Sequence, residues 1–336
     1  MSETPKIVAT QGDEGSYSVE AARALFGASV PIHDCGSFGK VIRETRQDGP
    51  KGMGVIAVKT AKGAVERSMA ELINVVPDAL PDVTGRVDLD VSLVLVSAQD
   101  QALEDVTRPE WTRRVYVHAH REAWRQSEAG VRDLLDRPNH RGSKDNIQAV
   151  KTIQEIDRRD NLAIGPAHAV EPFGVYQIGE EQVNPPNSVT RFYGLQLDPR
   201  IQLIFPDEEK TAKRAVVSIT HPTEPGAIHE VLELFESQEL RPMDFIGFPT
   251  NGDPSNGGIF EISGDLYMPK LREFCARVSR IRDVEGERGR FMTRILGGFH
   301  WYPEDPMDMD VFADRYGDVV SDDAPLVVRS SSSANG

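Results

Sequence analysis

A hydroxyl and a guanidinium stand next to each other at Thr190 and Arg191. Two prolines precede this segment, so we expect a loop that enters a strand at 187–192. Alternation along a strand would place Thr190 and Phe192 on one side and Arg191 on the other. A guanidinium can hold a carboxylate through two hydrogen bonds, and a Thr hydroxyl in a dry pocket can donate to a leaving oxygen. These three residues are candidates for catalysis, although the same tripeptide also occurs as ordinary strand sequence.

A glycine-containing turn near the N-terminus is a second candidate. In 11–18, Gly15 and Ser16 come between an apolar segment and a helical pattern, where unpaired helix N–H groups can bind an anion. A substrate carboxylate could bind there, but a structural turn capped by a serine would need the same residues. The spacing matches neither a dinucleotide-binding fingerprint nor a Walker loop, so nucleotide binding is not supported.

Two pairs of basic residues could have either a functional or a purely structural role. Lys59 and Lys62 come just before a glycine and could supply a cation for a substrate carboxylate, or could lie on a solvated helix entry. His118 and His120 could point to the same side of a strand, as a metal pair does, but no carboxylate or cysteine at a usable spacing completes a site. No metal and no other cofactor is predicted.

The residues up to about 192 alternate short apolar runs with helical patterns, which is typical of an α/β domain. Such a domain would contain mostly parallel, buried strands. A helical pattern at 18–26 places Val19, Ala22 and Phe26 on one face. The apolar runs lie at 6–10, 54–58, 89–96, 114–118 and 161–164.

The chain after a charged, proline-containing stretch has a different pattern. Strand-like and helical segments follow each other there in the order βαββαβ, a ferredoxin-like unit. The last residues are rich in Asp and Ser, and we expect them to be disordered. The predicted organisation is a first domain at 1–200, a linker at 201–213, a second domain at 214–303 and a tail at 304–336.

The composition is that of an ordinary globular protein, with 39% hydrophobic and 27% charged residues. The formal net charge of -15 argues against nucleic acid and anionic lipid as partners. The longest apolar stretch is far shorter than the ~20 residues needed to cross a bilayer, and no secretion signal is recognisable at the N-terminus. The two cysteines, Cys35 and Cys275, fit a reducing cytoplasm better than a disulfide framework.

Five segments resemble prephenate dehydratases that carry a C-terminal ACT domain, and they occur in the same order along the chain as in that family. The resemblance covers most of residues 6–303. The segment 11–18 is similar to the family's Gly-Pro-x-Gly-Thr-Tyr/Phe-Ser, with Asp13 for Pro and Ser16 for Thr. Thr190, Arg191 and Phe192 match the family's Thr-Arg-Phe motif, in which the Thr is held to be essential. The other similar segments are 160–176, 225–228 (the ACT Pro-Gly-Ala-Leu turn) and 295–299 (the closing Leu-Gly-Ser-Tyr).

Four segments depart from the family, and one of them is the Ser-Thr-Ala segment, which is poorly kept near 143–149. The family's Pro-Ile-Glu-Asn-Ser falls on 57–61, where Lys59 replaces the carboxylate and Thr60 the amide. The Ser-His-Pro-x-Ala segment falls on 119–123, which keeps His120 but loses the hydroxyl. The Glu-Ser-Arg-Pro motif tied to phenylalanine binding falls on 246–249, which lacks the charged partners, so the resemblance does not carry phenylalanine feedback over to this chain.

The resemblance implies a two-lobed, periplasmic-binding-protein-like catalytic domain followed by a ferredoxin-like ACT domain. It implies a cofactor-free lyase that converts prephenate to phenylpyruvate. Thr190 would assist departure of the hydroxide, Arg191 would hold a carboxylate or orient Thr190, and Phe192 would shape the pocket wall. The predicted substrate-binding residues are Gly15, Ser16, Lys59, Thr60 and His120, and the predicted effector-binding residues are Gly226, Ala227 and Ile228.

The implied partners are a small-molecule dicarboxylate substrate, an amino-acid effector and further copies of the chain, paired through the ACT domain. Two rival functions stay open. The altered segment 57–61 leaves room for a prephenate-type decarboxylase or a related lyase on a prephenate analogue. The loss of pocket hydroxyls leaves room for a non-catalytic small-molecule sensor.

Overall fold

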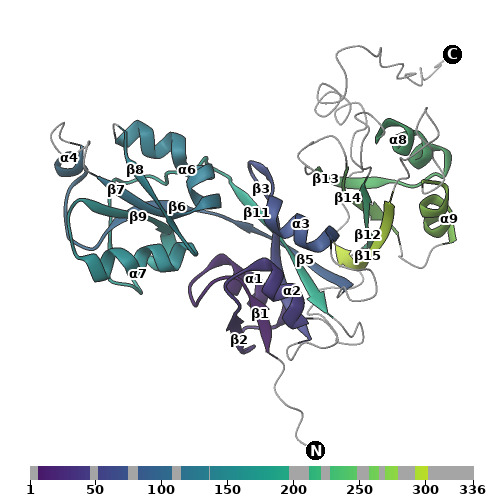
Figure 1. The fold of residues 1–336 in the computed structure, drawn as a ribbon, viewed down its shortest axis with the longest axis horizontal. Helices are drawn as coiled ribbons and strands as arrows, with labels where there is room; N and C mark the ends of the chain where they lie inside the picture. The colour runs from purple at the N-terminus through teal and green to yellow at the C-terminus, as the bar shows by residue number, and fades with distance from the viewer. Residues whose placement is uncertain are drawn as a thin grey trace, which may run out of the picture. The chain divides into compact units, whose positions relative to one another are not determined.

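The structure is a computed structural model, and its chain forms two compact units, Met1–Asp207 and Glu208–Gly336 (Figure 1). Most of the predicted linker and the whole predicted tail lie outside the described residues. The described residues are 7–45, 52–74, 82–107, 115–135, 137–196, 212–220, 228–247, 257–264, 269–278 and 292–301.

The first unit contains two lobes, each built on its own group of strands. The strands of the first lobe are ordered β5-β11-β3-β1-β2, with β4 paired to β3. Its elements are β1 (Val8–Thr10), α1 (Tyr17–Phe26), β2 (Ile32–Asp34), α2 (Phe38–Thr45), β3 (Met53–Thr60), β4 (Gly63–Ala64), α3 (Glu66–Asn74), β5 (Asp82–Asp90) and β11 (Val189–Gln196).

Helices α1 and α2 pack against opposite faces of the first-lobe sheet. On one face, Leu25 of α1 packs with Val55 and with Phe192 of β11. On the other face, a side chain at Gly54 would meet Thr45 Oγ1 of α2 at 2.4 Å. Because neighbouring strand residues point to opposite faces, residue 55 faces α1 and residue 54 faces α2.

The second lobe is a five-stranded sheet in the order β10-β6-β9-β7-β8. Alternation along β6 again separates two helices, because Leu95 packs in the same cluster as Val131 of α6, and Val96 packs with Val150 of α7. The two helices therefore lie on opposite sides of this sheet (Figure 1). Its elements are β6 (Leu93–Ser97), α4 (Leu103–Val106), β7 (Tyr116–His120), α6 (Arg121–Leu134), β8 (Asn139–Ser143), α7 (Asn146–Ile156), β9 (Asn161–Pro166), a 3-10 turn (Ala167–Ala169) and β10 (Tyr176–Gln177).

The predicted α/β class is confirmed, but the prediction of mostly parallel strands is wrong. Strand β1 is parallel to β2 and β3, and β7 is parallel to β8 and β9. Strand β11 is antiparallel to both β3 and β5, and β6 is antiparallel to β9 and β10. The reason is the two-lobed path: β5 leads the chain out of the first lobe and β11 brings it back, so these two strands run in opposite directions.

The second unit has the predicted element order βαββαβ, and its strand pairs are antiparallel. Its strands are ordered β13-β14-β12-β15. The core is aromatic: the ring of Phe235 lies 4.9 Å from that of Phe260 and 4.3 Å from that of Phe274. Its elements are β12 (Ala212–Thr220), α8 (Ile228–Ser237), β13 (Pro242–Gly247), β14 (Gly257–Ser263), α9 (Pro269–Val278) and β15 (Met292–Trp301).

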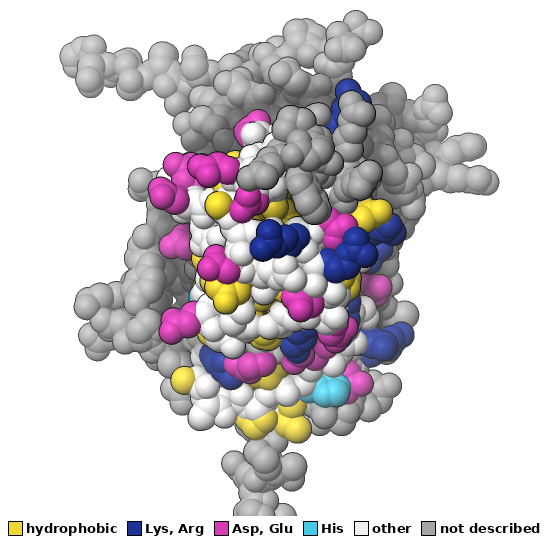
Figure 2. All heavy atoms as spheres, turned by 90° about the vertical axis from the view of Figure 1, so that its left-hand side faces the viewer, with side chains coloured by type: hydrophobic (Ala, Val, Ile, Leu, Met, Phe, Trp, Pro, Cys, Tyr) yellow, Lys and Arg dark blue, Asp and Glu magenta, His cyan; other side chains and the backbone are white. Residues whose placement is uncertain are grey.

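The surface in Figure 2 mixes both signs of charge. Acidic side chains alternate there with Lys and Arg, and hydrophobic side chains occur in small groups. In the described part of the chain, the large hydrophobic residues that are exposed are Ile156, Tyr176 and Val189. None of the described helices is long and apolar enough to cross a membrane.

Candidate active site

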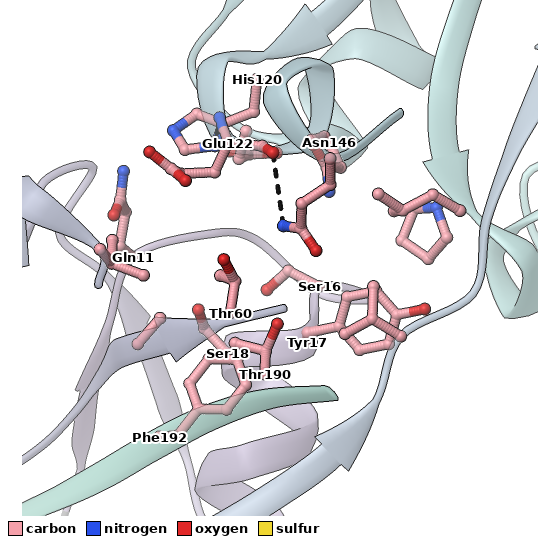
Figure 3. A pocket seen from close by; sticks show the side chains of 18 of the residues that line it. Gln11, Ser16, Tyr17, Ser18, Thr60, His120, Glu122, Asn146, Thr190 and Phe192 are labelled. Atoms are coloured by element: carbon pink, nitrogen blue, oxygen red, sulfur yellow. Dashed lines mark hydrogen bonds between the residues drawn. The ribbon is translucent and has the colours of Figure 1, made fainter. Parts of the chain in front are cut away.

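A pocket lies between the two lobes of the first unit (Figure 3). One wall of the pocket comes from α1, β3, β11 and the turn before α1, and the opposite wall comes from the start of α6, the start of α7 and the end of β9. Its lining residues are Gln11, Ser16, Tyr17, Ser18, Phe38, Ala57, Thr60, Val65, Val91, Leu93, His120, Glu122, Ala123, Gln126, Asp145, Asn146, Pro166, Thr190 and Phe192.

A bulge in β3 brings Thr60 to the same side as Thr190. Arg191 of β11 pairs with Lys59, but the next residue, Phe192, pairs with Ala57, so Val58 is an extra residue in the ladder. In a regular strand, Ala57 and Thr60 would point to opposite faces, and the extra residue reverses that relation. Both of these side chains therefore line the pocket together with those of Thr190 and Phe192.

The first-lobe wall carries hydroxyl groups that lack partners. Thr190 is 6% exposed, and its hydroxyl makes no hydrogen bond to any described residue. Ser16 is the N-cap residue of α1, yet its side chain does not cap the helix, and its buried Oγ has no partner. Figure 3 shows the hydroxyls of Ser16, Thr60 and Thr190 pointing into the pocket. Buried polar groups in a native protein are normally paired, so the hydroxyls of Thr190 and Ser16 are available to a bound molecule.

Gln126 supplies an unpaired acceptor from the second-lobe wall. Its Nε2 donates to the carbonyl oxygen of Glu122 at 3.3 Å, the dashed line in Figure 3. Because that carbonyl can only accept, the orientation of the amide is fixed, and Oε1 is the buried atom left without a partner. The buried Oδ1 of Asn146 also lacks a partner.

Sequence reasoning missed Gln126, Glu122 and Asn146. A signal for two of them was present, because the predicted residue His120 ends a strand and a helix starts directly after it. Glu122 and Gln126 are four residues apart, and they therefore lie on the same face of that helix. Asn146 follows the N-cap residue of α7, and only the fold brings that helix start to the same pocket.

His120 is held in its neutral form. Burial lowers the pKa of its imidazole, and the nearby Glu122 carboxylate opposes the shift only in part. Its Nδ1 accepts the backbone N–H of Glu122 at 3.4 Å, so the remaining proton is on Nε2. His120 can therefore donate a hydrogen bond but does not carry a positive charge near neutral pH.

Arg191 lies outside the pocket lining, on the other face of β11. Its guanidinium holds Asp88, with Nε 3.0 Å from Oδ1 and Nη2 3.1 Å from Oδ2. Arg86 binds the same carboxylate, with Nε 3.0 Å from Oδ1 and Nη2 2.6 Å from Oδ2. Burial acts to raise the pKa of Asp88, but the two guanidiniums outweigh it and hold the pKa below its ordinary value. Of its two predicted roles, direct binding of a substrate carboxylate does not fit this position, whereas orientation of Thr190 stays a prediction.

Two predicted substrate-binding residues also lie outside the pocket lining. Lys59 is opposite Arg191 in the β3–β11 ladder, which places it on the face away from Thr190. Gly15 has φ +88, and a side chain there would meet Phe173 at 3.2 Å and Ile147 at 3.3 Å. Its role in the structure is a positive-φ turn that the second lobe approaches closely.

Ser16, Thr60 and His120 do line the pocket, but the hydroxyl of Thr60 is occupied. It donates to the carbonyl of Gly63 at 3.3 Å and accepts the N–H of Lys62 at 3.2 Å. Of the three predicted effector-binding residues, Gly226 and Ala227 lie outside the described residues, as does the side chain of Ile228 at the start of α8.

Helix N-termini supply the positive potential of the pocket. The N-cap residues of α1, α6 and α7 are Ser16, His120 and Asp145, and all three line it. Among the lining residues of the described chain there is no Lys or Arg, and there are two carboxylates, Glu122 and Asp145. Asp145 caps α7 through the N–H of Gln148, whereas α1 lacks a side-chain cap. The start of α1 is therefore the end of the pocket best suited to an anion.

The described residues contain no group of three or more His, Cys, Asp or Glu side chains that could hold a metal ion. His118 and His120 do not act as a pair, because His118 Nε2 contacts Asn161 Oδ1 at 3.0 Å while His120 caps α6. The polar groups of the pocket are hydroxyls, amides, carboxylates and one neutral imidazole. This set can orient a small polar molecule and donate hydrogen bonds to an oxygen that gains negative charge.

Comparison with known proteins gives a consistent result. The family model of prephenate dehydratase matches residues 8–200. A bifunctional chorismate mutase/prephenate dehydratase from Stutzerimonas stutzeri is 28% identical over 245 residues, which are 71% of this chain and 60% of that relative. This chain thus matches less than two thirds of that relative's length.

Solved structures share the fold. The prephenate dehydratase from Arthrobacter aurescens, solved in complex with L-Phe, has a TM-score of 0.64 at 18% identity, over 93% of this chain and 98% of that one. GqqA, described as a novel type of quorum quenching acylase, has a TM-score of 0.60 at 20% identity, over 89% and 99%. The prephenate dehydratase from Staphylococcus aureus has a TM-score of 0.54 at 20% identity, over 87% and 99%. The predicted two-lobed, periplasmic-binding-protein-like fold is thereby confirmed.

Proposed function

Because this chain belongs to the prephenate dehydratase family, we propose that it is a cofactor-free lyase that converts prephenate to phenylpyruvate, carbon dioxide and water. The observation that carries the proposal is the hydroxyl of the buried residue Thr190, which makes no hydrogen bond to a described residue and points into the pocket (Figure 3). Phe192 also lines the pocket, so the hydroxyl donor of Thr190 lies in partly apolar surroundings. A hydrogen bond there is stronger than the same bond in water.

The proposed reaction requires no covalent bond between the protein and the substrate. The bond between the ring and its carboxylate breaks, carbon dioxide leaves, and the electron pair moves through the ring as the C–O bond to the hydroxyl breaks. The departing hydroxide takes up a proton and becomes water, and aromatisation drives the process. The enzyme has to hold the substrate in position and stabilise the negative charge that develops on the leaving oxygen. Thr190 donates to that oxygen.

The remaining unpaired groups are suited to hold the substrate. The buried Ser16 hydroxyl and the uncapped start of α1 favour a carboxylate of the substrate. The buried Oε1 of Gln126 can only accept, so it suits the hydrogen of a substrate hydroxyl. Neutral His120 supplies a further donor through Nε2. Donors on the first-lobe wall, together with an acceptor and a donor on the second-lobe wall, would thus orient a molecule that carries carboxylates and a hydroxyl.

The test is to incubate the purified protein with prephenate near neutral pH and to identify products by mass spectrometry and NMR against spontaneous decay. Phenylpyruvate formed well above the blank supports the proposal. A decarboxylated product that is not aromatic would refute dehydration and favour the decarboxylase alternative. Absence of any product, together with saturable binding of prephenate, would favour the sensor.

We further propose that the second unit is an ACT-like regulatory domain that pairs with a second copy and binds an amino acid. Its βαββαβ order supports this assignment, as does the similarity of the whole chain to the Arthrobacter aurescens structure, which covers 93% of this chain. Light scattering of the purified chain should report a dimer or larger assembly, and an amino acid should change the rate of turnover. A monomer that no amino acid affects would contradict the assignment.

A further inference from the structure

Arg125 joins the two lobes at the rim of the pocket. It belongs to α6 of the second lobe, and its Nη1 donates to the carbonyl of Lys62 at 3.0 Å in the turn between β3 and β4 of the first lobe. Its Nη2 lies 3.4 Å from both the carbonyl of Ala64 and Oγ1 of Thr60. Its Nε holds Oε2 of Glu122 at 3.0 Å. One guanidinium thus contacts two pocket-lining side chains and two backbone carbonyls of the opposite lobe.

We propose that Arg125 is a positioning residue that holds residues 61–64 of the first lobe onto α6 and thereby fixes the distance between the two walls of the pocket. As a step in catalysis, this role rests on the proposed function. Arg125 acts through Thr60 and Glu122, which line the pocket, and does not itself touch the substrate.

Ion pairs also join the lobes between Lys144 and Asp34, between Lys151 and Asp13, and between His168 and Glu20. Arg125 differs from these pairs because it contacts a pocket-lining side chain of the opposite lobe, Thr60. Arg121, its neighbour on α6, reaches Glu66 at 3.5 Å with both side chains more than half exposed, an arrangement that contributes little. Arg125 is 36% exposed and Glu122 20%, and the fork of the guanidinium spreads its donors over several acceptors at once. Because the carbonyl acceptors belong to the turn (Lys62) and to β4 (Ala64), the contact restrains backbone as well as side chains.

The state of Thr60 supports the same role. Its hydroxyl donates to Gly63 and accepts from both Lys62 and Arg125, so no proton of this hydroxyl is left for a substrate. Thr60 is therefore a fixed part of the wall, and Arg125 ties that part of the wall to the second lobe. The free oxygen of Glu122 faces a pocket whose width the same contact sets.

The experiment compares Arg125→Ala and Arg125→Lys with Arg132→Ala as a matched control. Arg132 is on the same helix, is 52% exposed and pairs with Glu128 within α6. Hydrogen–deuterium exchange of the ligand-free full chain is followed at 60–66, and kcat and KM are measured with prephenate. Loss of hydrogen bonds to a charged group should speed exchange at 60–66 and raise KM in Arg125→Ala, each by about tenfold, with a smaller fall in kcat. Arg125→Lys should recover part of both, and Arg132→Ala should change neither.

The two readouts separate this inference from the proposed function. Unchanged exchange at 60–66 in Arg125→Ala, or a KM equal to that of the Arg132→Ala control, overturns the inference. A fall in kcat at constant KM also overturns it, because that pattern belongs to a group that acts only in the transition state. If the parent protein does not convert prephenate but Arg125→Ala still speeds exchange at 60–66, the proposed reaction fails and the positioning role of Arg125 stands.

Discussion

Replacing Thr190 by Val removes the hydroxyl but keeps the branched shape of the side chain. The hydroxyl has no partner among the described residues, so this change removes no hydrogen bond within the part of the protein that the structure describes. Since residue 190 is 6% exposed, the new methyl group is buried. We therefore expect the free energy of unfolding to stay within about 0.5 kcal/mol of the parent value, or to rise slightly.

The expected effect on catalysis is much larger. Loss of one fixed donor aimed at developing negative charge lowers kcat by about 10²- to 10³-fold, which corresponds to ~2.7–4 kcal/mol. KM should change little, because the hydrogen bond strengthens as charge accumulates on the leaving oxygen. Thr190→Ser keeps the donor and should stay within about tenfold of the parent kcat.

The assay combines the rate of phenylpyruvate formation with urea unfolding of the three proteins. A Thr190→Val protein that keeps more than about a tenth of the parent kcat would refute the assignment of Thr190 as the donor. A loss of unfolding free energy as large as the loss of activation free energy would also refute it, because the residue would then act through the fold.

Three further predictions concern other residues. Gln126→Leu should raise KM by about tenfold in steady-state kinetics, because the change removes a buried acceptor, Oε1, whose orientation is fixed by the hydrogen bond of the same amide. An unchanged KM would show that Gln126 does not bind the substrate. Asp88→Asn should lower the free energy of unfolding by about 2 kcal/mol in urea titrations, because two guanidiniums keep only a neutral partner. Because the pKa of Asp88 is lowered in the folded state, its contribution is full above the unfolded pKa of about 3.9 and disappears as the pH falls through the folded pKa. Burial lowers the folded pKa of His120 below 6.5, so the unfolded state takes up more protons and stability should fall as the pH drops below about 6.5, a dependence that His120→Gln should weaken.

Local patterns were enough to predict the α/β class and the βαββαβ order of the second unit. Apolar runs such as that in β6 and the spacing along α1 report burial directly, because side-chain direction follows the period of the element. The direction of the strands could not be obtained in this way. A strand buried on both faces has the same apolar composition whether it is parallel or antiparallel to its neighbours, so the mixed sheets were missed.

The sequence by itself determined which residue types could do chemistry and some of the places where they would lie. Thr190 and Ser16 were predicted, because a strand entry and a helix start can be recognised from neighbouring residues, and His120 was predicted from the resemblance of 119–123 to the family. It also predicted that Arg191 would face away from Thr190, since alternation along a strand is a local property.

Only the tertiary structure decided which candidates share one pocket. The bulge at Val58 turns Thr60 toward Thr190, whereas Lys59 lies on the other face beside Arg191. Gln126 of α6 comes to the same pocket because the chain returns through β11, far along the sequence from the helix. The physical reason is that a binding site is made from contacts between distant segments, and these depend on strand register and lobe packing, which no local pattern of residues encodes.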